Sequence, residues 1–248
     1  MSTIKLADYP TRPPRSTDRE EIEKKTRKLI REIADLQELL YANRRYSLLV
    51  IFQGMDSSGK DGATHNVFKR CSPSGVSAYS FKKPTKLEMA HDFLWRVHQQ
   101  VPEKGMIKIF NRSHYEDILI QRVHGWIDEG RVTHRIQSIN AFEELLEYDN
   151  DTKVLKFYMH LSRERQREKL QERIDERDKN WKHNPNDWEE AKLWDRYMEC
   201  YEDAINRSSV PWHIVPVDSR WYRDYAIAKV VAETLRSFEM DWPALTES

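Results

Sequence analysis

Residues 47–64 read SLLVIFQGMDSSGKDGAT, and this stretch decides the fold class of the chain. The apolar run at residues 48–52 has the length of a buried strand and leads into Gly54. Four residues separate Gly54 from Gly59 and Lys60. In a loop with this spacing, backbone N–H groups converge on phosphate oxygens, the lysine adds a charge, and the next helix directs its positive end at the anion. The stretch predicts a strand, a phosphate-binding loop and a helix.

The loop departs from the usual pattern at the position after its lysine. Ser or Thr commonly stands there and holds magnesium, but this chain has Asp61. A second carboxylate, Asp56, lies inside the loop and could replace the missing hydroxyl, because Mg²⁺ prefers oxygen ligands. The alternative, a plain glycine turn between a strand and a helix, explains neither the lysine nor the small residues after it.

Composition places the chain in an ordinary class of globular protein. Its 248 residues suit one large α/β domain, or one domain carrying a lid. The 41 basic and 41 acidic residues balance, so no overall field directs the protein to nucleic acid or to a membrane. An anionic substrate must therefore be met by local clusters of charge.

The location of the protein is also suggested by the sequence. Its two cysteines, Cys71 and Cys200, form no disulfide framework, which favours a reducing compartment. The N-terminus lacks the profile of a signal peptide, and no apolar run approaches the ~18 residues of a membrane span. A cytoplasmic protein is expected.

Strand and helix patterns alternate along the chain. Residues 1–15 have the proline and charge content of an N-terminal arm, and residues 16–240 are expected to form a single domain. Strands are expected at residues 48–53, 76–81, 106–110, 154–161 and 212–217. Helices are expected at residues 63–70, 87–100, 113–124, 136–148, 163–178, 188–206 and 223–238. This alternation predicts a parallel five-stranded sheet with helices on both faces.

A further helix is expected near the N-terminus, behind a capping box at residues 17–20. Its apolar residues recur at heptad-like spacing, which favours packing in the core or against another subunit over a ligand surface. This stripe is the sequence feature that suggests a homo-oligomer, a dimer or a tetramer.

The residues that follow the expected strands are mostly basic. Ligands of a parallel sheet bind at the carboxyl ends of its strands. Apart from the phosphate loop, these ends carry residues 82–86, 111–117, 162–167 and 218–221, and each segment contains Lys or Arg. Because the net charge of the chain is zero, this clustering predicts an anion-binding edge.

Four motifs together resemble the family-2 polyphosphate kinases. They are the loop at residues 54–62, including both unusual aspartates, and the segments 90–96, 110–117 and 181–182. They occur in the order of the family, and the resemblance extends from about Arg15 to about Phe238. It implies an α/β P-loop kinase fold like that of thymidylate kinase, with a helical lid at about residues 163–190. It also implies Mg²⁺-assisted phosphoryl transfer between inorganic polyphosphate and AMP or ADP, forming ADP or ATP.

The resemblance assigns roles to residues at matching positions. The catalytic residues that it implies are Asp56, Lys60, Asn111, Arg112, Glu116 and Arg163. The residues that it implies for binding phosphate or nucleotide are Gly54, Ser57, Ser58, Gly59, Asp61, Gly62, Lys82, Arg96, Arg122, Arg173 and Lys182. The implied metal ligands are Asp56 and Glu116.

Within this set, Lys60 and the loop amides would hold phosphates at the reacting centre, and the arginines would hold polyphosphate or neutralise charge in transit. Lys82 and Arg96 would face the nucleotide. Many relatives have Asp at position 111 and Asn at position 116. The pair Asn111 and Glu116 is similar to the subgroup that accepts both AMP and ADP, and the amide at position 111 is only a neutral metal ligand.

Two other functions use the same loop. An ATP-dependent P-loop kinase of a small metabolite would contain it, but would not explain basic residues at so many strand ends. A nucleotide-binding switch without turnover would be expected to carry Ser or Thr after Lys60 and motifs that recognise a base, and neither is present.

Overall fold

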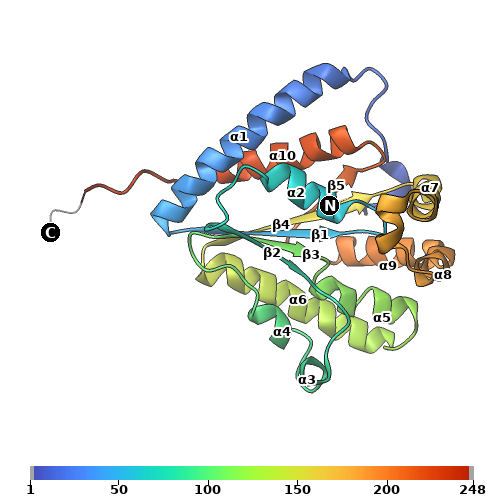
Figure 1. Ribbon diagram of the computed structural model, residues 1–248. Coiled ribbons are helices and arrows are strands. Elements are labelled where there is room, and N and C mark those ends of the chain that lie inside the picture. Colours follow the sequence, from blue (N-terminus) through green and yellow to red (C-terminus); the bar gives the residue numbers. More distant parts are fainter. Residues whose placement is uncertain (1–2, 246–248) are drawn as a thin grey trace.

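The computed structural model describes residues 3–245 and has a central sheet covered by helices on both faces (Figure 1). The strands are β1 (Ser47–Gln53), β2 (Val76–Ser80), β3 (Ile107–Asn111), β4 (Thr152–His160) and β5 (Trp212–Pro216). Their order is β2-β3-β1-β4-β5, and every neighbouring pair is parallel. All seven residues of β1 are buried, as expected for the central strand of a sheet covered on both faces. The expected five-stranded parallel sheet is confirmed.

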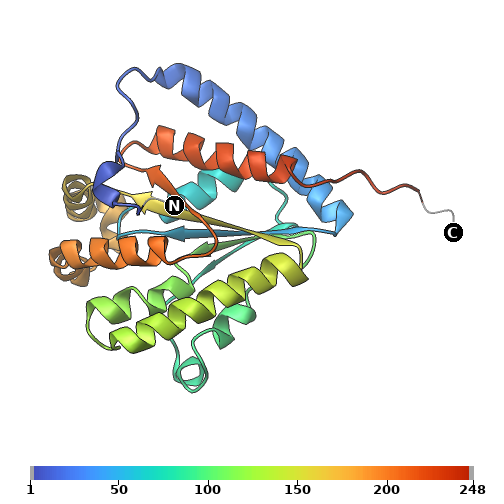
Figure 2. The same ribbon diagram turned by 180° about the vertical axis from the view of Figure 1, so that it is seen from behind.

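One face of the sheet is covered by α1 (Arg19–Asn43), α2 (Lys60–Phe68) and α10 (Arg220–Arg236) (Figures 1 and 2). The apolar stripe of α1 faces this core, where Ile33 and Leu40 are fully buried. The stripe therefore packs within the chain, and it no longer supports a homo-oligomer. The side chain of Asp18, not a capping box begun by Thr17, caps α1 by accepting hydrogen bonds from the N–H groups of Glu20 and Glu21.

The opposite face is covered mainly by α6 (Glu129–Asp149), with α4 (Trp95–His98), α5 (Ile120–Val123) and α9 (Trp194–Asn206) around it (Figures 1 and 2). Three helices expected from the sequence are interrupted here. The expected helix 87–100 forms α3 (Lys86–Met89) and α4, because the Asp92 carboxylate accepts hydrogen bonds from the backbone of Leu94 and Trp95 and begins a new turn.

The other two interruptions lie at Ser113 and at Leu193. The expected helix 113–124 forms a 3₁₀ helix (His114–Asp117) and α5, because the Ser113 hydroxyl accepts a hydrogen bond from the Tyr115 N–H and tightens the first turn. The expected helix 188–206 forms α8 (Asn186–Lys192) and α9, which meet at Leu193 with a ψ of 15°.

The carboxyl ends of the strands face α7 (Arg163–Asp175), a 3₁₀ helix (Arg177–Lys182) and α8 (Figure 1). The N-terminal segment, with a 3₁₀ helix at Leu6–Asp8, lies along α9. Its backbone at Leu6 donates to Glu202 Oε1 at 2.6 Å, and the Leu6 side chain is buried. Among residues 3–245, no helix is long and apolar enough to cross a membrane.

Candidate functional site

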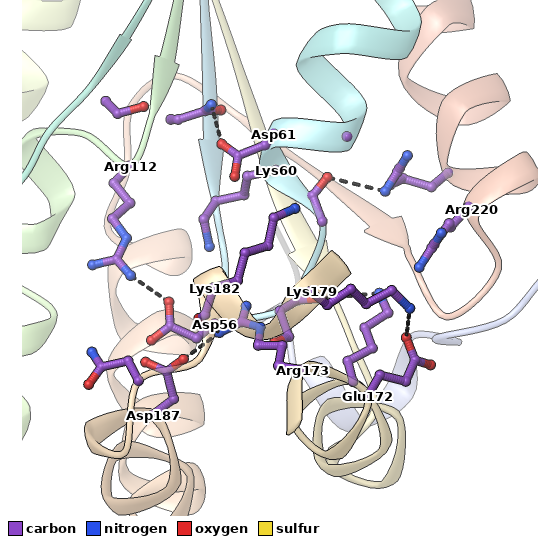
Figure 3. Close-up of a pocket in the computed structure, with 18 of the residues that line it drawn as sticks. Asp56, Lys60, Asp61, Arg112, Glu172, Arg173, Lys179, Lys182, Asp187 and Arg220 are labelled. Atoms are coloured by element: carbon purple, nitrogen blue, oxygen red, sulfur yellow. Dashed lines mark hydrogen bonds and ion pairs between the residues drawn. The ribbon is translucent and has the colours of Figure 1, made fainter. Parts of the chain in front are cut away.

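A cavity of about 830 Å³ lies at the carboxyl edge of the sheet, between the phosphate loop and the helices α7 and α8 (Figure 3). Its lining holds ten Lys or Arg side chains and five Asp or Glu side chains. The cationic ones are Lys60, Lys82, Lys83, Arg112, Lys169, Arg173, Lys179, Lys182, Arg220 and Arg223. The acidic ones are Asp56, Asp61, Glu172, Asp178 and Asp187. An excess of positive charge in a concave site favours a polyanionic ligand.

The phosphate loop has a backbone that only small residues allow. A Cβ atom at Gly54 would lie 2.9 Å from the carbonyl oxygen of Met159, so only glycine fits beside β4. Gly59 has a φ of +87° and stands directly before α2, where no side chain caps the helix. The first N–H groups of α2 are therefore available to an anion, and the helix dipole favours negative charge there.

Lys60 lies within this loop. Its ammonium group donates to the carbonyl oxygens of Gly54 at 2.7 Å and Met55 at 3.1 Å. Burial, assisted by the charge of Arg112, lowers the pKa of Lys60 to about 8, although nearby carboxylates oppose the shift. Lys60 therefore changes charge close to neutral pH unless an anion binds beside it.

Asp56 and Arg112 form an ion pair across the cavity (Figure 3). Burial raises the pKa of the Asp56 carboxyl, but the charges of Arg112, Lys60 and Arg173 outweigh it, and the net pKa lies below the ordinary value. Asp56 is therefore a carboxylate at neutral pH. Arg112 follows β3 in the left-handed region, with a φ of +61°, which directs its side chain toward the loop.

The structure separates the two residues that were expected to choose the acceptor. Asn111 lines the cavity and donates from Nδ2 to Asp61 Oδ1 at 2.9 Å. Glu116 is not part of the cavity lining, and its Oε1 accepts a hydrogen bond from Gln53 Nε2 at 2.9 Å. Asn111 therefore borders the cavity. Glu116 does not, but its charge raises the pKa of both Lys60 and Arg112.

Helix α7 is joined to the phosphate loop. Gln166 donates to the Asp56 carbonyl at 3.2 Å, and Lys169 donates to the Ser57 carbonyl at 3.1 Å. Burial and the charges of Arg165, Arg220 and Arg223 lower the pKa of Lys169 to about 8. The first half of the segment expected to be a lid is thus bonded to the loop in this structure.

The second half of that segment supplies two more cavity residues. Arg173 of α7 forms an ion pair with Asp187 of α8 and contributes to lowering the pKa of Asp56 (Figure 3). Lys182 lines the cavity (Figure 3), as does Lys82 after β2. Among residues 3–245, no carboxylate lies within 4.0 Å of either lysine. Neither ammonium group is thus neutralised by a described acid, and that of Lys182 lies 4.9 Å from the centre of the Trp181 ring.

Three arginines expected at the site lie outside the cavity lining. Arg163 points to Asp195 on α9, at 3.4 Å. Arg122 is held by two carboxylates, Glu129 at 2.6 Å and Asp203 at 2.7 Å. Both guanidinium groups already have acidic partners, so a phosphate would have to compete with them.

Arg96, the third, is buried under the cavity. Its guanidinium donates to the Lys82 carbonyl at 2.9 Å and pairs with Asp117 at 3.3 Å. Arg96 therefore holds the segment that carries Lys82, and its own side chain lies outside the cavity lining. Gly54 and Ser58 also lie outside the lining but belong to the fold of the phosphate loop, where Ser58 is fully buried.

Several cavity residues were given no individual role from the sequence, although most lie in the expected lid or at the expected anion-binding edge: Lys83, Lys169, Glu172, Asp178, Lys179, Asp187, Arg220 and Arg223. A signal existed for Arg220 and Arg223, because they follow the last strand at the ligand-binding edge. Lys169 and Asp187 lie in the segment expected to be a lid, but only the packing of α7 and α8 shows that their side chains reach the cavity.

The residues of the site fit a magnesium ion that is shared with substrate. Within residues 3–245, no group of three or more His, Cys, Asp or Glu side chains could hold a metal ion. Kinase sites, however, commonly bind Mg²⁺ through one or two carboxylates and the phosphates of the substrate. Asp56 and Asp61 both line the cavity and offer such oxygens, whereas Glu116 does not line it.

Comparisons with known proteins agree with this geometry. The model of the family polyphosphate kinase 2 matches residues 16–242. An AMP/ADP-polyphosphate phosphotransferase of Meiothermus ruber is 46% identical over 87% of this chain and 81% of its own length. An ADP-polyphosphate phosphotransferase of Rhodopseudomonas palustris is 38% identical over 98% of this chain and 89% of its own.

A solved structure also confirms the expected fold. The crystal structure of polyphosphate kinase 2 from Arthrobacter aurescens TC1 superposes with a TM-score of 0.95 and 35% sequence identity. The superposition covers 100% of this chain and 90% of that chain. The P-loop kinase-like sheet and its helices are thus shared along the whole chain.

Proposed function

The chain belongs to the polyphosphate kinase 2 family and is a phosphotransferase, and we propose that it transfers a phosphoryl group reversibly between inorganic polyphosphate and AMP or ADP. The products in the forward direction are ADP and ATP. One observation carries the proposal: the cavity around the phosphate loop holds ten cationic side chains against five acidic ones. Both proposed substrates are polyanions, and a chain without net charge concentrates its positive charge where they would bind.

The proposed chemistry needs little from the protein except position and charge. Phosphoryl transfer is accelerated mainly by aligning donor and acceptor and by neutralising charge on the moving group. Lys60 and the N-terminus of α2 would hold the phosphates at the reacting centre. Arg112 and Arg173 reach the same region from β3 and α7, and their guanidinium groups suit phosphate oxygens.

A bound magnesium ion would be held by Asp56, with Asp61 beside it. It would neutralise part of the phosphate charge. The ion pair with Arg112 keeps the Asp56 pKa low, so the carboxylate is ready to bind the ion at neutral pH.

The proposed acceptors and setting follow from the same site. Asn111 presents a neutral amide to the cavity, which supports acceptance of both AMP and ADP. The free cysteines Cys71 and Cys200 support a cytoplasmic setting, where these nucleotides are abundant. A homo-oligomer needs a surface other than the apolar stripe of α1, and light scattering on the purified chain would measure its size.

The test is to incubate the purified protein with polyphosphate, Mg²⁺ and either AMP or ADP, and to follow ADP and ATP by chromatography. We expect both products, and none from a Lys60→Ala preparation purified in parallel, which controls for contaminating kinases. A kinase of a small metabolite would instead consume ATP without needing polyphosphate. A nucleotide switch would bind nucleotide and form neither product.

A further inference from the structure

Arg223 is the largest fully buried side chain described in the protein, and it connects α10 to the phosphate loop. Its Nε and Nη2 atoms donate to Asp224 Oδ1 at 2.8 and 2.6 Å. Its Nη1 atom donates to the carbonyl oxygen of Gly59 at 3.1 Å. The second carboxylate oxygen of Asp224 accepts from Asn66 Nδ2 of α2 at 2.7 Å. A series of hydrogen bonds thus joins Asn66 of α2 to Asp224 and Arg223 of α10, and Arg223 to the Gly59 carbonyl.

Burying a guanidinium group is costly unless its donors are satisfied. Within residues 3–245, Asp224 is the one carboxylate that pairs with Arg223. The other hydrogen bond of its guanidinium group goes to the Gly59 carbonyl of the phosphate loop and not to a second carboxylate. This arrangement restrains the Gly59 carbonyl, because the guanidinium group that donates to it is itself held by Asp224.

The glycines of the loop are matched to this arginine. A Cβ atom at Gly59 would lie 2.4 Å from Arg223 Nη1, and a Cβ atom at Gly62 would lie 3.3 Å from both Nη1 and Nη2. Gly59 also needs glycine because its φ is +87°. Gly62 lies within α2 and has no such requirement, and the guanidinium of Arg223 is the neighbour that would have to move to admit a methyl group there.

We propose that Arg223 is a positioning residue of the phosphate loop. The Gly59 carbonyl accepts two hydrogen bonds, from the Ala63 N–H of α2 at 3.0 Å and from Arg223 at 3.1 Å. With the second bond, Arg223 restricts the plane of the Gly59–Lys60 peptide, and with it the Lys60 N–H on the opposite side of that plane. That N–H stands at the uncapped start of α2, where phosphate would bind. Arg223 therefore sets the direction of the Lys60 N–H from α10, a helix that is distant in sequence but packs against α2. This role rests on the proposed function.

The first test is Arg223→Ala. We expect kcat for ATP formation from ADP and polyphosphate to fall about 100-fold, the scale found when a group in the site is misplaced by ~1 Å. Lys229→Ala is the matched control, because Lys229 is an exposed cation of the same helix, α10, and its one acidic partner in the described part of the chain is Glu233. The control should keep wild-type kcat. An Arg223→Ala enzyme with wild-type kcat would overturn the proposal.

The second test separates positioning from general support of the fold. Gly62→Ala adds the methyl group that contacts the guanidinium, so it should lower kcat in the wild-type background. In the Arg223→Ala background the same change should cost nothing further and should raise Tm, since Ala is a better helix former than Gly. Equal loss of kcat from Gly62→Ala in both backgrounds would refute the role of Arg223. Arg223→Lys, which leaves space beside Gly62 and keeps a charge, provides the second background if the alanine variant does not fold.

Calorimetry with tripolyphosphate distinguishes this proposal from the proposed reaction. Arg223→Ala should weaken tripolyphosphate binding, and adding Gly62→Ala should weaken it no further. If the variants bind tripolyphosphate in this way but the wild type makes no ATP, the proposed reaction is wrong and the positioning role of Arg223 still holds. Unchanged tripolyphosphate affinity in Arg223→Ala would reject the positioning role whether or not the enzyme makes ATP.

Discussion

The side-chain amide of Asn111 donates a hydrogen bond to the Asp61 carboxylate, with 2.9 Å between Nδ2 and Oδ1. Thr64 holds the amide in this orientation, because its hydroxyl donates to Asn111 Oδ1 at 3.0 Å. Asp61 stands where Ser or Thr commonly follows the loop lysine. Asp61 and Asn111 thus form one unit, and an aspartate at position 111 would place two carboxylates against each other.

Exchanging the acceptor pair, Asn111→Asp with Glu116→Asn, should shift the ratio of AMP to ADP phosphorylation by at least about tenfold, the effect of about 1.4 kcal/mol in the transition state. The new carboxylate would repel both Asp61 and an acceptor phosphate. Initial rates with each acceptor at saturating polyphosphate measure the ratio. The single variant Glu116→Asn keeps the Asn111–Asp61 bond and is the control. Equal loss of both activities in the double variant would make these residues general supports.

Replacing either central loop residue should abolish transfer without unfolding the protein. Lys60→Ala removes the ammonium group at the reacting centre, and Asp56→Asn removes the proposed magnesium ligand. Losing one strong charge contact in the transition state costs ~3–4 kcal/mol, or a few hundredfold in rate. Neither side chain belongs to the apolar core, so Tm should stay close to that of the wild type. Activity within about tenfold of wild type in either variant would show that the loop does not take part in phosphoryl transfer.

The pH dependence should report the two lysines whose pKa lies at about 8, Lys60 and Lys169. Both are charged below that pH and lose their charge above it. We expect kcat/KM for polyphosphate to fall above pH 8, with a logarithmic slope that approaches about −2, because kcat/KM reports the free enzyme. The fall in kcat should occur at higher pH, since a bound polyanion raises both pKa values. Lys169→Arg keeps its charge and should reduce the slope to about −1. An unchanged slope would contradict the assignment.

Salt should weaken polyphosphate binding more steeply than nucleotide binding. A polyanion held by many cations loses affinity as a power of the salt concentration, and each phosphate contact adds about 0.7–0.9 to the exponent. Lys182 has no carboxylate within 4.0 Å among the described residues, so Lys182→Ala should lower the exponent for polyphosphate by about one. Titrations at several salt concentrations measure both exponents. Equal exponents for the two substrates would count against a basic cavity that holds polyphosphate.

Much of the fold could be predicted from the sequence because its signals are local. The buried strand at residues 48–52, the glycines and the lysine of the loop are neighbours in the chain. The alternation of strands and helices then gives a parallel sheet. The helix interruptions at Asp92 and Ser113 were missed, because a side chain that bonds to the backbone competes with a helix without changing the apolar period.

The cavity was only partly predictable from the sequence, because the packing of elements that are distant in sequence decides which side chains line it and which are neutralised. Whether an arginine is available depends on acids that are distant in sequence: Arg122 is neutralised by Asp203, 81 residues away. Arg223 reaches Gly59 from 164 residues away. No motif records either contact. The sequence therefore identifies the types of charge in the site but not which of them remain free.

A buried ionic network under β4 should be important for stability. Lys156 pairs with Glu143 of α6, both are fully buried, and His114 lies 3.1 Å from the other oxygen of Glu143. Lys156→Met removes the main partner of a buried carboxylate. It should lower the free energy of unfolding by ~3–5 kcal/mol, the cost of leaving a buried charge uncompensated.

The matched control is Lys153→Met on the same strand, β4. Lys153 forms a partly exposed pair with Glu147 at 2.9 Å, and such pairs contribute about 0–1 kcal/mol. Urea denaturation of both variants at pH 7 measures the difference. Because His114 follows Arg112 by two residues, Lys156→Met should also loosen the loop after β3 and lower kcat more than it raises KM. Equal stability of the two methionine variants would contradict the expected cost of leaving the buried Glu143 carboxylate without its main partner.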